Sequence, residues 1–265
     1  MRTLVIGDIH GAVMALQEVL IRSSFNYIED RLIFLGDYVD GWSQSAELIQ
    51  FLIELEEQCK IKPIFLRGNH DYWAEQWLLY GDTNKIWREQ GGEATILSYV
   101  KTKYIVDQKH KDFFYNLQNY FIDEENRGYV HGGYSSRKGL GHEAHNSTYY
   151  WDRDLWSLAL MSHDRHHEAI NDYEGEYFRR FEKHKEVFIG HTATTNWRYK
   201  VHYPESSSHS DVGKKIMVPM HRCNVWNMDT GCGWDGKLTI MDVDTKEYWQ
   251  SNLVKELYPN ELGRS

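Results

Sequence analysis

The sequence predicts an α/β fold in which parallel strands alternate with helices and polar residues collect at one edge of a sheet. The first observation is that three apolar runs end abruptly in polar, glycine-containing turns: Leu4-Val5-Ile6 before Gly7-Asp8, Leu32-Ile33-Phe34-Leu35 before Gly36-Asp37, and Pro63-Ile64-Phe65-Leu66 before Arg67-Gly68. The second is helical periodicity between these runs. Together they predict a parallel layer with right-handed crossovers.

The first half of the chain is expected to provide this layer. Strands are expected at residues 3–6, 31–35 and 62–66, and helices at 12–21 and 47–55, where apolar residues recur at helical spacing. Ser43 is a plausible N-cap for the second helix. A helical excursion near 72–118 follows, because Trp73, Trp77 and Leu78 recur at helical spacing in a segment rich in Glu and Gln.

The second half is expected to add strands and longer loops. Its expected strands cover 119–123, 128–131 and 186–189, and its helices 151–160 and 164–184. An irregular loop is expected near 197–222, and strands at 224–228, 237–243 and 247–250 are expected to form a closing antiparallel ribbon. No linker rich in Pro, Gly or Ser divides the chain, so residues 1–265 are expected to form a single domain.

Composition is typical of a soluble globular protein, with 41% hydrophobic and 26% charged residues among 265. The longest apolar runs have strand length, so we expect no membrane span, and Met1 to Thr3 enter a strand at once, so we expect no secretory leader. A net charge of -9 disfavours nucleic acid as a general partner. Three cysteines without metal or redox spacing favour a cytoplasmic location.

Six potential metal ligands lie at strand ends, each next to a residue that permits a sharp turn: Asp8, His10, Asp37, Asn69, His131 and His191. Carboxylate, imidazole and amide ligands together suit Mn, Fe or Zn better than Mg or Ca. Asp37 is the natural bridge between two ions, because its strand is expected between the other two. Each motif alone is more often a structural turn, but five in order favour a two-metal site for phosphoryl transfer.

These motifs resemble those of the calcineurin-like metallophosphoesterases: GDIHG at 7–11, GDYVD at 36–40, RGNHD at 67–71, HGG at 131–133 and GHT at 190–192. The resemblance is strongest to the phosphoprotein-phosphatase branch, which includes phage-type and bacterial Ser/Thr phosphatases and symmetrical diadenosine tetraphosphate hydrolases. Residues 150–153 resemble the WxR element of that branch, and residues 227–239 resemble its IDTGAVxGGxLT segment. Over residues 3 to about 245, the resemblance implies a β-sandwich of two mixed sheets flanked by helices.

The resemblance also implies a role for each residue. Two divalent ions, with manganese favoured over iron or zinc, would be held by Asp8 and His10 on one side, by Asn69, His131 and His191 on the other, and by Asp37 between them. His70 would protonate the leaving oxygen while a metal-bridging hydroxide attacks phosphorus. Asp40 would orient His70 and raise its pKa, and Arg153 and Asn69 would contact the phosphate.

One departure from the family pattern concerns phosphate binding. The family usually has GDxVDRG, but Gly41 and Trp42 replace the Arg-Gly pair here, so one phosphate-binding arginine is missing from its usual place. Arg67, Arg137 and Lys138 are candidate substitutes, with Arg67 the one we assign to the substrate phosphate. Trp42 and the aromatic run 149–151 could stack on a base or grip a phosphopeptide, although packing is the commoner role.

Three functions are weighed on these grounds. The first is a metal-dependent phosphatase for phosphomonoesters, including phosphoserine or phosphothreonine in a phosphoprotein. The alternative is a symmetrical bis(5'-nucleosyl)-tetraphosphatase that hydrolyses diadenosine polyphosphates. A non-catalytic scaffold stabilised by metal ranks last, because every expected ligand and the expected acid are present. The motif GNHD and the missing arginine favour the dinucleotide, while the WDRDLW element favours the phosphatase.

Overall fold

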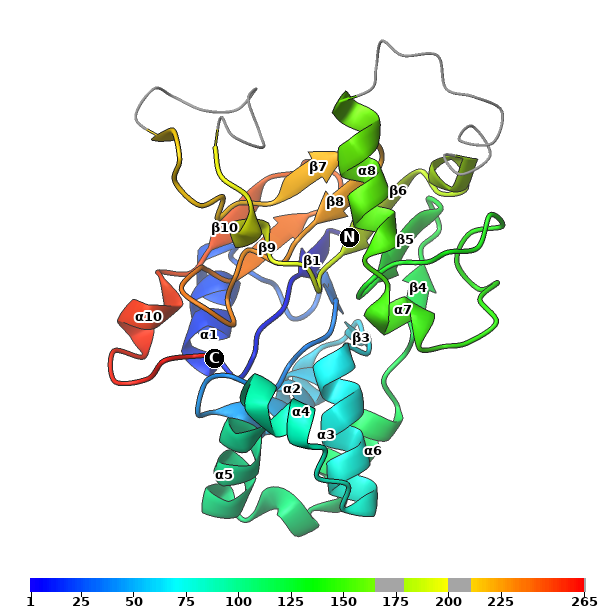
Figure 1. Ribbon diagram of the computed structural model, residues 1–265. Helices are drawn as coiled ribbons and strands as arrows, with labels where there is room; N and C mark the ends of the chain where they lie inside the picture. The colour runs from blue at the N-terminus through cyan, green and yellow to red at the C-terminus, as the bar shows by residue number, and fades with distance from the viewer. Residues whose placement is uncertain (165–178, 200–210, 265) are drawn as a thin grey trace.

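Two five-stranded sheets pack face to face with helices outside them (Figure 1). The structure is a computed structural model that describes residues 1–164, 179–199 and 211–264. The expected single-domain fold of two mixed sheets flanked by helices is confirmed. In the described residues, no helix is both long and apolar enough to cross a membrane.

The first sheet contains the three strands that the apolar runs predicted. Its order is β10-β9-β1-β2-β3, with β1 at Thr3–Ile6, β2 at Arg31–Phe34, β3 at Ile64–Phe65, β9 at Thr239–Asp242 and β10 at Tyr248–Gln250. β1, β2 and β3 are parallel, as predicted, and β9 and β10 extend the sheet antiparallel to β1. The polar turns after the parallel strands therefore lie at one edge.

The second sheet is built mainly from the middle of the chain. Its order is β4-β5-β6-β8-β7, with β4 at Tyr120–Ile122, β5 at Arg127–Val130, β6 at Glu186–Ile189, β7 at Met220–Arg222 and β8 at Val225–Asn227. β5, β6 and β8 are parallel to one another. The turns after β5 and β6 therefore also share an edge.

Side chains alternate along the strands between a core shared by the two sheets and a core on the outer face of each sheet. Val5, Ile33, Tyr129 and Phe188 lie in the cluster that contains residues of both sheets. Their strand neighbours face outward, where Leu4 and Ile6 pack in the cluster that also holds the helices beside the first sheet. Burial on both faces explains why these strands are continuous apolar runs rather than alternating ones.

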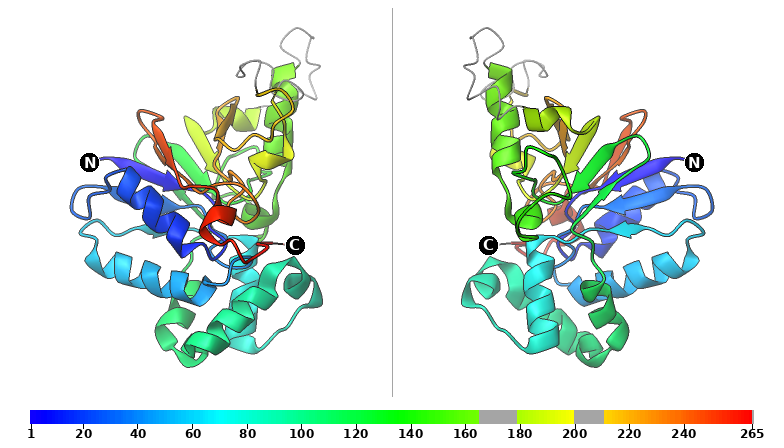
Figure 2. Two further views of the ribbon diagram at one scale, coloured as in Figure 1. Left: turned by 90° about the vertical axis from the view of Figure 1, so that its left-hand side faces the viewer. Right: turned by 90° about the vertical axis from the view of Figure 1, so that its right-hand side faces the viewer.

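Helices cover both outer faces. α1 at Val13–Arg22 and α2 at Ser45–Gln58 lie outside the first sheet, and α8 at Asp154–Asp164 stands beside the second (Figure 2). The predicted helical excursion is confirmed, and it contains α3 at Asn69–Tyr80, α4 at Lys85–Trp87, a π-helical turn at Arg88–Gly92, α5 at Glu93–Thr102, a 3₁₀ turn at Tyr104–Val106 and α6 at Gln108–Tyr115. Short α7 at Thr148–Trp151 and α10 at Val254–Leu257, with 3₁₀ turns at Arg179–Glu182 and Thr194–Asn196, complete the described elements.

Several local expectations are wrong. The closing antiparallel ribbon forms only in part: β9 and β10 pair antiparallel as expected, but β8 joins the second sheet beside β6. Residues 220–222, expected within a loop, form β7 by pairing with β8. Ser43 does not cap α2, since its hydroxyl donates to Glu261 instead. The helix expected at 164–184 lies largely outside the described residues, as does the centre of the 197–222 loop.

Candidate metal centre

The polar turns after β1, β2, β3, β5 and β6 converge at one place between the two sheets. Four residues of these turns, His10, Asp37, Asp40 and His191, have positive φ values between 53° and 72°. This left-handed conformation is uncommon for residues with a side chain and persists where the surrounding structure enforces it. Three of the six potential ligands that the strand-end motifs singled out, His10, Asp37 and His191, thus lie in strained turns.

Asp37 lies at the centre of the cluster. One group of potential ligand atoms comes from Asp8, His10 and Asp37, and a second comes from Asp37, His131 and His191, with the atoms of each group within 4.8 Å of one another. All these side chains are buried. Asp37 is common to both groups, which is the arrangement that a carboxylate bridging two ions requires.

The imidazoles are oriented to offer their Nε2 atoms. His10 donates from Nδ1 to the carbonyl of Val39 at 2.9 Å, and His131 donates from Nδ1 to the carbonyl of Leu35 at 3.0 Å. These bonds leave the Nε2 lone pairs for a metal ion. Nε2 of His191 is buried and has no hydrogen-bond partner.

The negative charges of the carboxylates and the facing lone pairs in the cluster also favour a bound cation. Nε2 of His131 faces Oδ1 of Asn69 at 3.2 Å, and two acceptors this close need a proton or a cation between them. Burial opposes a charged imidazole, yet the carboxylates of Asp37 and Asp8 raise the pKa of His131 to about 9. The donor set therefore fits divalent metal ions.

Two glycines leave space for the carboxylates. A Cβ atom on Gly68 would lie 2.0 Å from Oδ1 of Asp37, and one on Gly190 would lie 2.0 Å from Oδ1 of Asp8. These distances are far below any tolerable contact, so only glycine fits beside either carboxylate. The glycines of the RGNHD and GHT motifs thus admit the potential ligands.

Asp71 holds two turns in register, a role that sequence analysis missed. Its carboxylate accepts from the backbone N–H groups of Asp37 at 2.7 Å, Tyr38 at 2.8 Å and Gly68 at 2.8 Å. It therefore ties the turn after β2 to the start of α3. The feature of the sequence that could have indicated this role is the position of Asp71 immediately after Asn69 and His70, which places it inside the same cluster.

His70 and Asp40 form a buried pair. Nδ1 of His70 lies 2.6 Å from Oδ2 of Asp40, and the Asp40 carboxylate also accepts from Trp87 Nε1 and Thr95 Oγ1, each at 2.6 Å. The expectation that this pairing raises the imidazole pKa is wrong. Burial lowers the pKa of His70 to about 3 although the negative charge of Asp37 opposes this, and it raises the pKa of Asp40 to about 8 although the hydrogen bonds from Thr95 and Trp87 oppose that.

Asp229 is a further carboxylate that the sequence prediction did not assign to the site. It is buried, and its Oδ1 accepts from the backbone N–H of Gly231 at 3.0 Å. Burial and the negative charge of Asp229 raise the pKa of Asp8 well above its usual value. Asp229 therefore adds negative charge beside the first ligand group, which favours a bound cation.

The two arginines predicted to bind phosphate, Arg153 and Arg67, have different surroundings. Nη1 of Arg153 donates to the carbonyl of His191 at 3.1 Å and to Oγ1 of Thr192 at 2.8 Å, so its guanidinium lies beside the cluster. Arg67 is committed elsewhere, because its guanidinium is bonded to Glu75 and to the carbonyl of Phe114. The structure therefore does not support Arg67 as the substitute for the missing arginine.

The aromatic residues are mostly packing elements. Trp42 is buried, donates to the carbonyl of Cys232 at 2.7 Å and stacks on Tyr258. Tyr150 stacks on Tyr72 in the same way. Trp151 differs, because it is 39% exposed while its ring lies 6.3 Å from that of His191.

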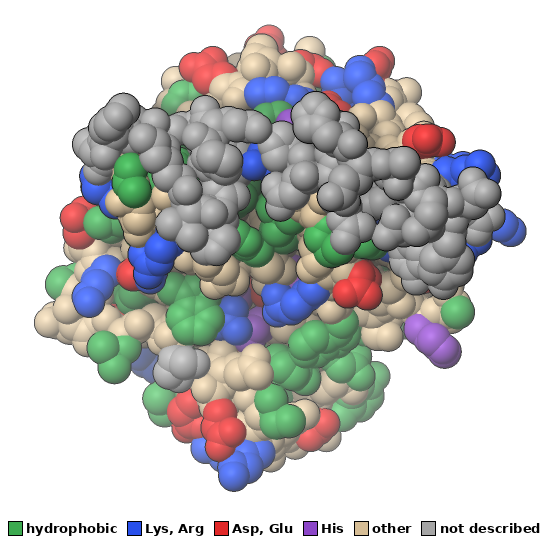
Figure 3. All heavy atoms as spheres, turned by 45° about the horizontal axis from the view of Figure 1, so that its top comes forward, with side chains coloured by type: hydrophobic (Ala, Val, Ile, Leu, Met, Phe, Trp, Pro, Cys, Tyr) green, Lys and Arg blue, Asp and Glu red, His purple; other side chains and the backbone are tan. Residues whose placement is uncertain are grey.

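Arg264, which no motif indicated, also reaches the cluster. Its Nη1 lies 3.3 Å from Nε2 of His10, and its guanidinium carbon lies 4.9 Å from the centre of the Trp234 ring. Burial lowers the pKa of His10 well below its usual value, and the positive charge of Arg264 lowers it further. On the surface, Lys or Arg side chains lie on either side of a histidine near the centre of one face (Figure 3).

The two-sheet fold surrounds a buried cluster that fits divalent metal ions, and comparison with known proteins identifies the family to which such a metal-dependent protein belongs. Residues 1–194 match the family profile Calcineurin-like phosphoesterase. The chain belongs to this family, whose members use divalent metal ions.

Two curated relatives carry the same name. A symmetrical bis(5'-nucleosyl)-tetraphosphatase of Pseudomonas syringae pv. syringae is 26% identical over 93% of this chain and 90% of its own length. A protein of the same name from Coxiella burnetii is 39% identical, but over only 26% of this chain and 22% of its own. The full-length similarity is therefore modest.

Solved structures share the fold at low identity. A protein-tyrosine phosphatase from a Shewanella species superimposes with a TM-score of 0.54 at 16% identity, covering 95% of this chain and 80% of its own. A serine/threonine phosphatase from Saccharomyces cerevisiae superimposes with a TM-score of 0.51 at 13% identity. The match covers 96% of this chain and 79% of the phosphatase. At these identities the likeness supports the two-sheet fold alone.

Proposed function

We propose that the chain is a two-metal hydrolase that cleaves a phosphoric anhydride of dinucleoside polyphosphates such as diadenosine tetraphosphate. The observation that carries the hydrolase chemistry is the shared Asp37, which belongs to both groups of potential ligands. The name of the full-length relative supports the substrate. This order reverses the ranking from sequence, which placed phosphomonoesters first.

In this proposal the residues divide into two ligand sets that share one carboxylate. Asp8 and His10 would hold one ion, His131, His191 and Asn69 would hold the other, and Asp37 would be a ligand of both. When bound, two such ions supply Lewis acidity and an activated water nucleophile. Manganese is the favoured ion, with iron and zinc as alternatives, because the set mixes imidazole nitrogen with carboxylate and amide oxygen.

His70 is the proposed proton donor to the leaving oxygen. It is bonded to Asp40, and the pair can hold one proton between them because the pKa of Asp40 is raised by burial to about 8. Arg153, beside His191, is placed to orient a phosphoryl oxygen. The chain's own groups thus position the phosphate and move the proton.

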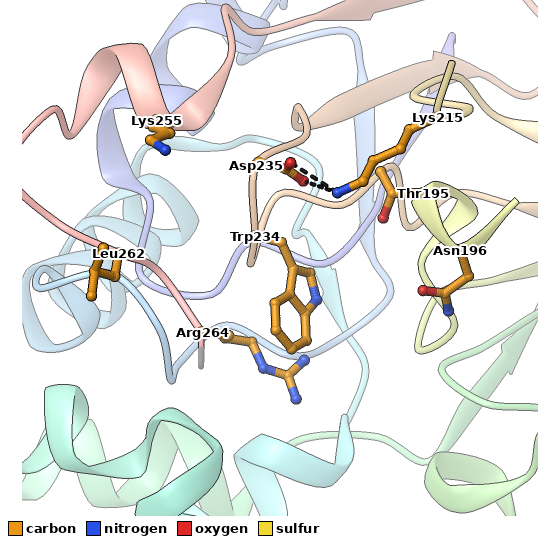
Figure 4. Close-up of a pocket in the computed structure, with 8 residues that line it drawn as sticks. All are labelled: Thr195, Asn196, Lys215, Trp234, Asp235, Lys255, Leu262 and Arg264. Carbon is orange, nitrogen blue, oxygen red and sulfur yellow. Dashed lines mark hydrogen bonds and ion pairs between the residues drawn. The ribbon is translucent and has the colours of Figure 1, made fainter. Parts of the chain in front are cut away.

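A cavity beside the cluster supports a substrate larger than a simple phosphoester. It has a volume of about 400 Å³ and is lined in part by Thr195, Lys215, Trp234 and Arg264 (Figure 4). Lys215 is paired with Asp235 at 2.9 Å, while Trp234 is 38% exposed. An aromatic ring and cations around a cavity of this size suit the nucleotide that extends beyond the reacting phosphate.

The test is a side-by-side assay of manganese-loaded protein with diadenosine tetraphosphate, p-nitrophenyl phosphate and a phosphoserine peptide. We expect the highest kcat/KM with the dinucleotide and two molecules of ADP as products, which symmetrical cleavage requires. ATP and AMP as products would contradict symmetrical cleavage. Faster turnover of the phosphopeptide would restore the phosphomonoester assignment, which the exposed Trp151 beside His191 favours as a second candidate.

We also propose a reducing compartment such as the cytoplasm. None of the three cysteines, Cys59, Cys223 and Cys232, forms a disulfide in the described part of the chain, and such thiols persist where glutathione keeps them reduced. Fractionation of cells that express the protein tests this placement.

A further inference from the structure

The guanidinium of Arg264 lies at the edge of the cluster opposite Arg153. Arg264 approaches Nε2 of His10 at 3.3 Å, whereas Arg153 is bonded to the backbone of His191. His10 belongs to the first ligand group and His191 to the second. Two guanidinium groups therefore flank the cluster, one on the side of each proposed ion.

Two glycines provide the space in which the Arg264 side chain lies. A Cβ atom on Gly41 would lie 2.9 Å from Cγ of Arg264, and one on Gly233 would lie 2.9 Å from its Cδ. Gly41 is also the position at which the family resemblance expects an arginine. The side chain that is absent from Gly41 is thus replaced in space by one from the far end of the sequence.

The segment that carries Arg264 is fixed to the rest of the domain. Its backbone N–H donates to the carbonyl of Gly233 at 2.8 Å, and three residues earlier Glu261 accepts from the backbone N–H of Ser43 at 2.9 Å. Gly263 packs against the ring of Trp42 with a φ of +70°. Figure 2 shows this segment running back to the junction between the sheets and the helical excursion.

The positive charge of Arg264 acts on the buried carboxylates of Asp40 and Asp229, where it opposes the rise in their pKa. Within the part of the chain that the structure describes, no carboxylate lies within ion-pair distance of its guanidinium, and its Nε is buried without a hydrogen-bond partner. The His10 lone pair that accepts from Arg264 is the one that His10 would offer to an ion. Once that ion is bound, the N–H groups of Arg264 are available to an anion.

We propose that Arg264 binds a phosphoryl oxygen of the substrate and so performs the task of the arginine missing at position 41. The proposal depends on the two-metal site described above, and it adds a phosphate-binding residue that lies outside the family motifs. With Arg153 on the other side, the phosphoryl group would be held from both flanks. A guanidinium suits this task because it presents several N–H donors in a rigid plane.

The experiment compares Arg264→Ala, Arg264→Lys and, as a control, Arg31→Ala. Arg31 is paired with Glu124, and because it begins β2 it lies at the opposite end of the strand from the cluster. Three quantities are measured for each manganese-loaded protein: manganese content, calorimetric affinity for inorganic phosphate, and kcat/KM with p-nitrophenyl phosphate. Free guanidinium chloride is then added to the Arg264→Ala protein.

We expect Arg264→Ala to keep its manganese and to bind phosphate about 10- to 100-fold more weakly, the range that a charged hydrogen bond supplies. The phosphate affinity of Arg264→Lys should lie between those of the parent protein and Arg264→Ala, and that of Arg31→Ala should match the parent protein. Added guanidinium should restore part of the phosphate affinity that Arg264→Ala has lost. Unchanged phosphate affinity in Arg264→Ala would overturn the proposal, as would tighter manganese binding without any loss of phosphate.

The phosphate measurement separates this proposal from the proposed function. If the parent protein binds phosphate through Arg264 but hydrolyses no phosphoester, the proposed function fails while the role of Arg264 stands. If it hydrolyses the dinucleotide and Arg264→Ala is indistinguishable from it in all three quantities, only the role of Arg264 fails.

Discussion

Nδ1 of His70 lies 2.6 Å from Oδ2 of Asp40, and both side chains are at most 1% exposed. His70 immediately follows Asn69 in α3, so the imidazole lies next to a potential metal ligand without belonging to either ligand group. A buried imidazole held in one orientation by a carboxylate is suited to deliver a proton at a fixed point. This relationship separates proton transfer from metal binding and allows each to be tested alone.

Replacing His70 should therefore affect turnover but not metal content. We expect His70→Ala to lower kcat by roughly 10²–10⁴-fold, the range that general acids supply, while manganese content stays at the parent level. Metal analysis and steady-state kinetics on one preparation provide both values. Loss of manganese together with activity would instead make His70 a ligand or a support for one.

Replacing Asp37 should affect both turnover and metal content. Asp37→Ala removes the carboxylate shared by the two ligand groups, so we expect manganese and activity to be lost together. Asp82→Ala is the control, because Asp82 is an exposed carboxylate beyond the end of α3. Full manganese content in purified Asp37→Ala protein would show that the other ligands suffice and that Asp37 does not bridge.

Adding one methyl group beside Asp8 should weaken metal binding without removing any ligand. The Cβ of Gly190→Ala would lie 2.0 Å from Oδ1 of Asp8, so the carboxylate must move. We expect manganese affinity to fall roughly 10- to 100-fold, as it does when support for a ligand is lost. A manganese titration of a variant whose circular dichroism matches the parent measures this, and unchanged affinity would mean that Asp8 is not a ligand.

His110 should make stability sensitive to acid. It is bonded to Tyr99 and Gln50, and burial lowers its pKa from 6.5 to about 4. Because the unfolded chain takes up this proton at the higher pH, the free energy of unfolding should fall as pH drops from about 6.5 towards 4. The fall should be smaller in His110→Gln than in the parent protein.

Urea unfolding at several pH values between 7 and 4 measures this difference. The control is His142→Gln, since His142 is exposed, and it should keep the parent's pH dependence. If His110→Gln lost stability with acid as steeply as the parent, other buried groups would have to explain the acid sensitivity.

Local sequence predicted the parallel strands and the residues at their ends. Leu32 to Leu35 lead into Asp37 through a glycine with a φ of +104°, and this apolar run and its turn are both visible within six residues. The same local logic identified His131 and His191. Because parallel strands bring their carboxyl ends to one edge, the convergence of these turns followed from the strand order.

Contacts between segments that are distant in the sequence could not be predicted from such local patterns. β8 and β9 were expected in one ribbon, and only the structure shows that β8 pairs with β6 and β9 with β1. Arg264 is 254 residues from His10 and has no motif around it, so its approach to the cluster could not be predicted. The pKa of His70 was mispredicted for a related reason, since its extent of burial depends on packing from several elements.

The most direct test of the two-metal account is anomalous diffraction from a crystal of the manganese-loaded protein. We expect two manganese peaks about 3.5–4 Å apart, with the Asp37 carboxylate between them, His10 beside one, and His131 and His191 beside the other. A single peak, or two peaks of which only one contacts Asp37, would contradict the account.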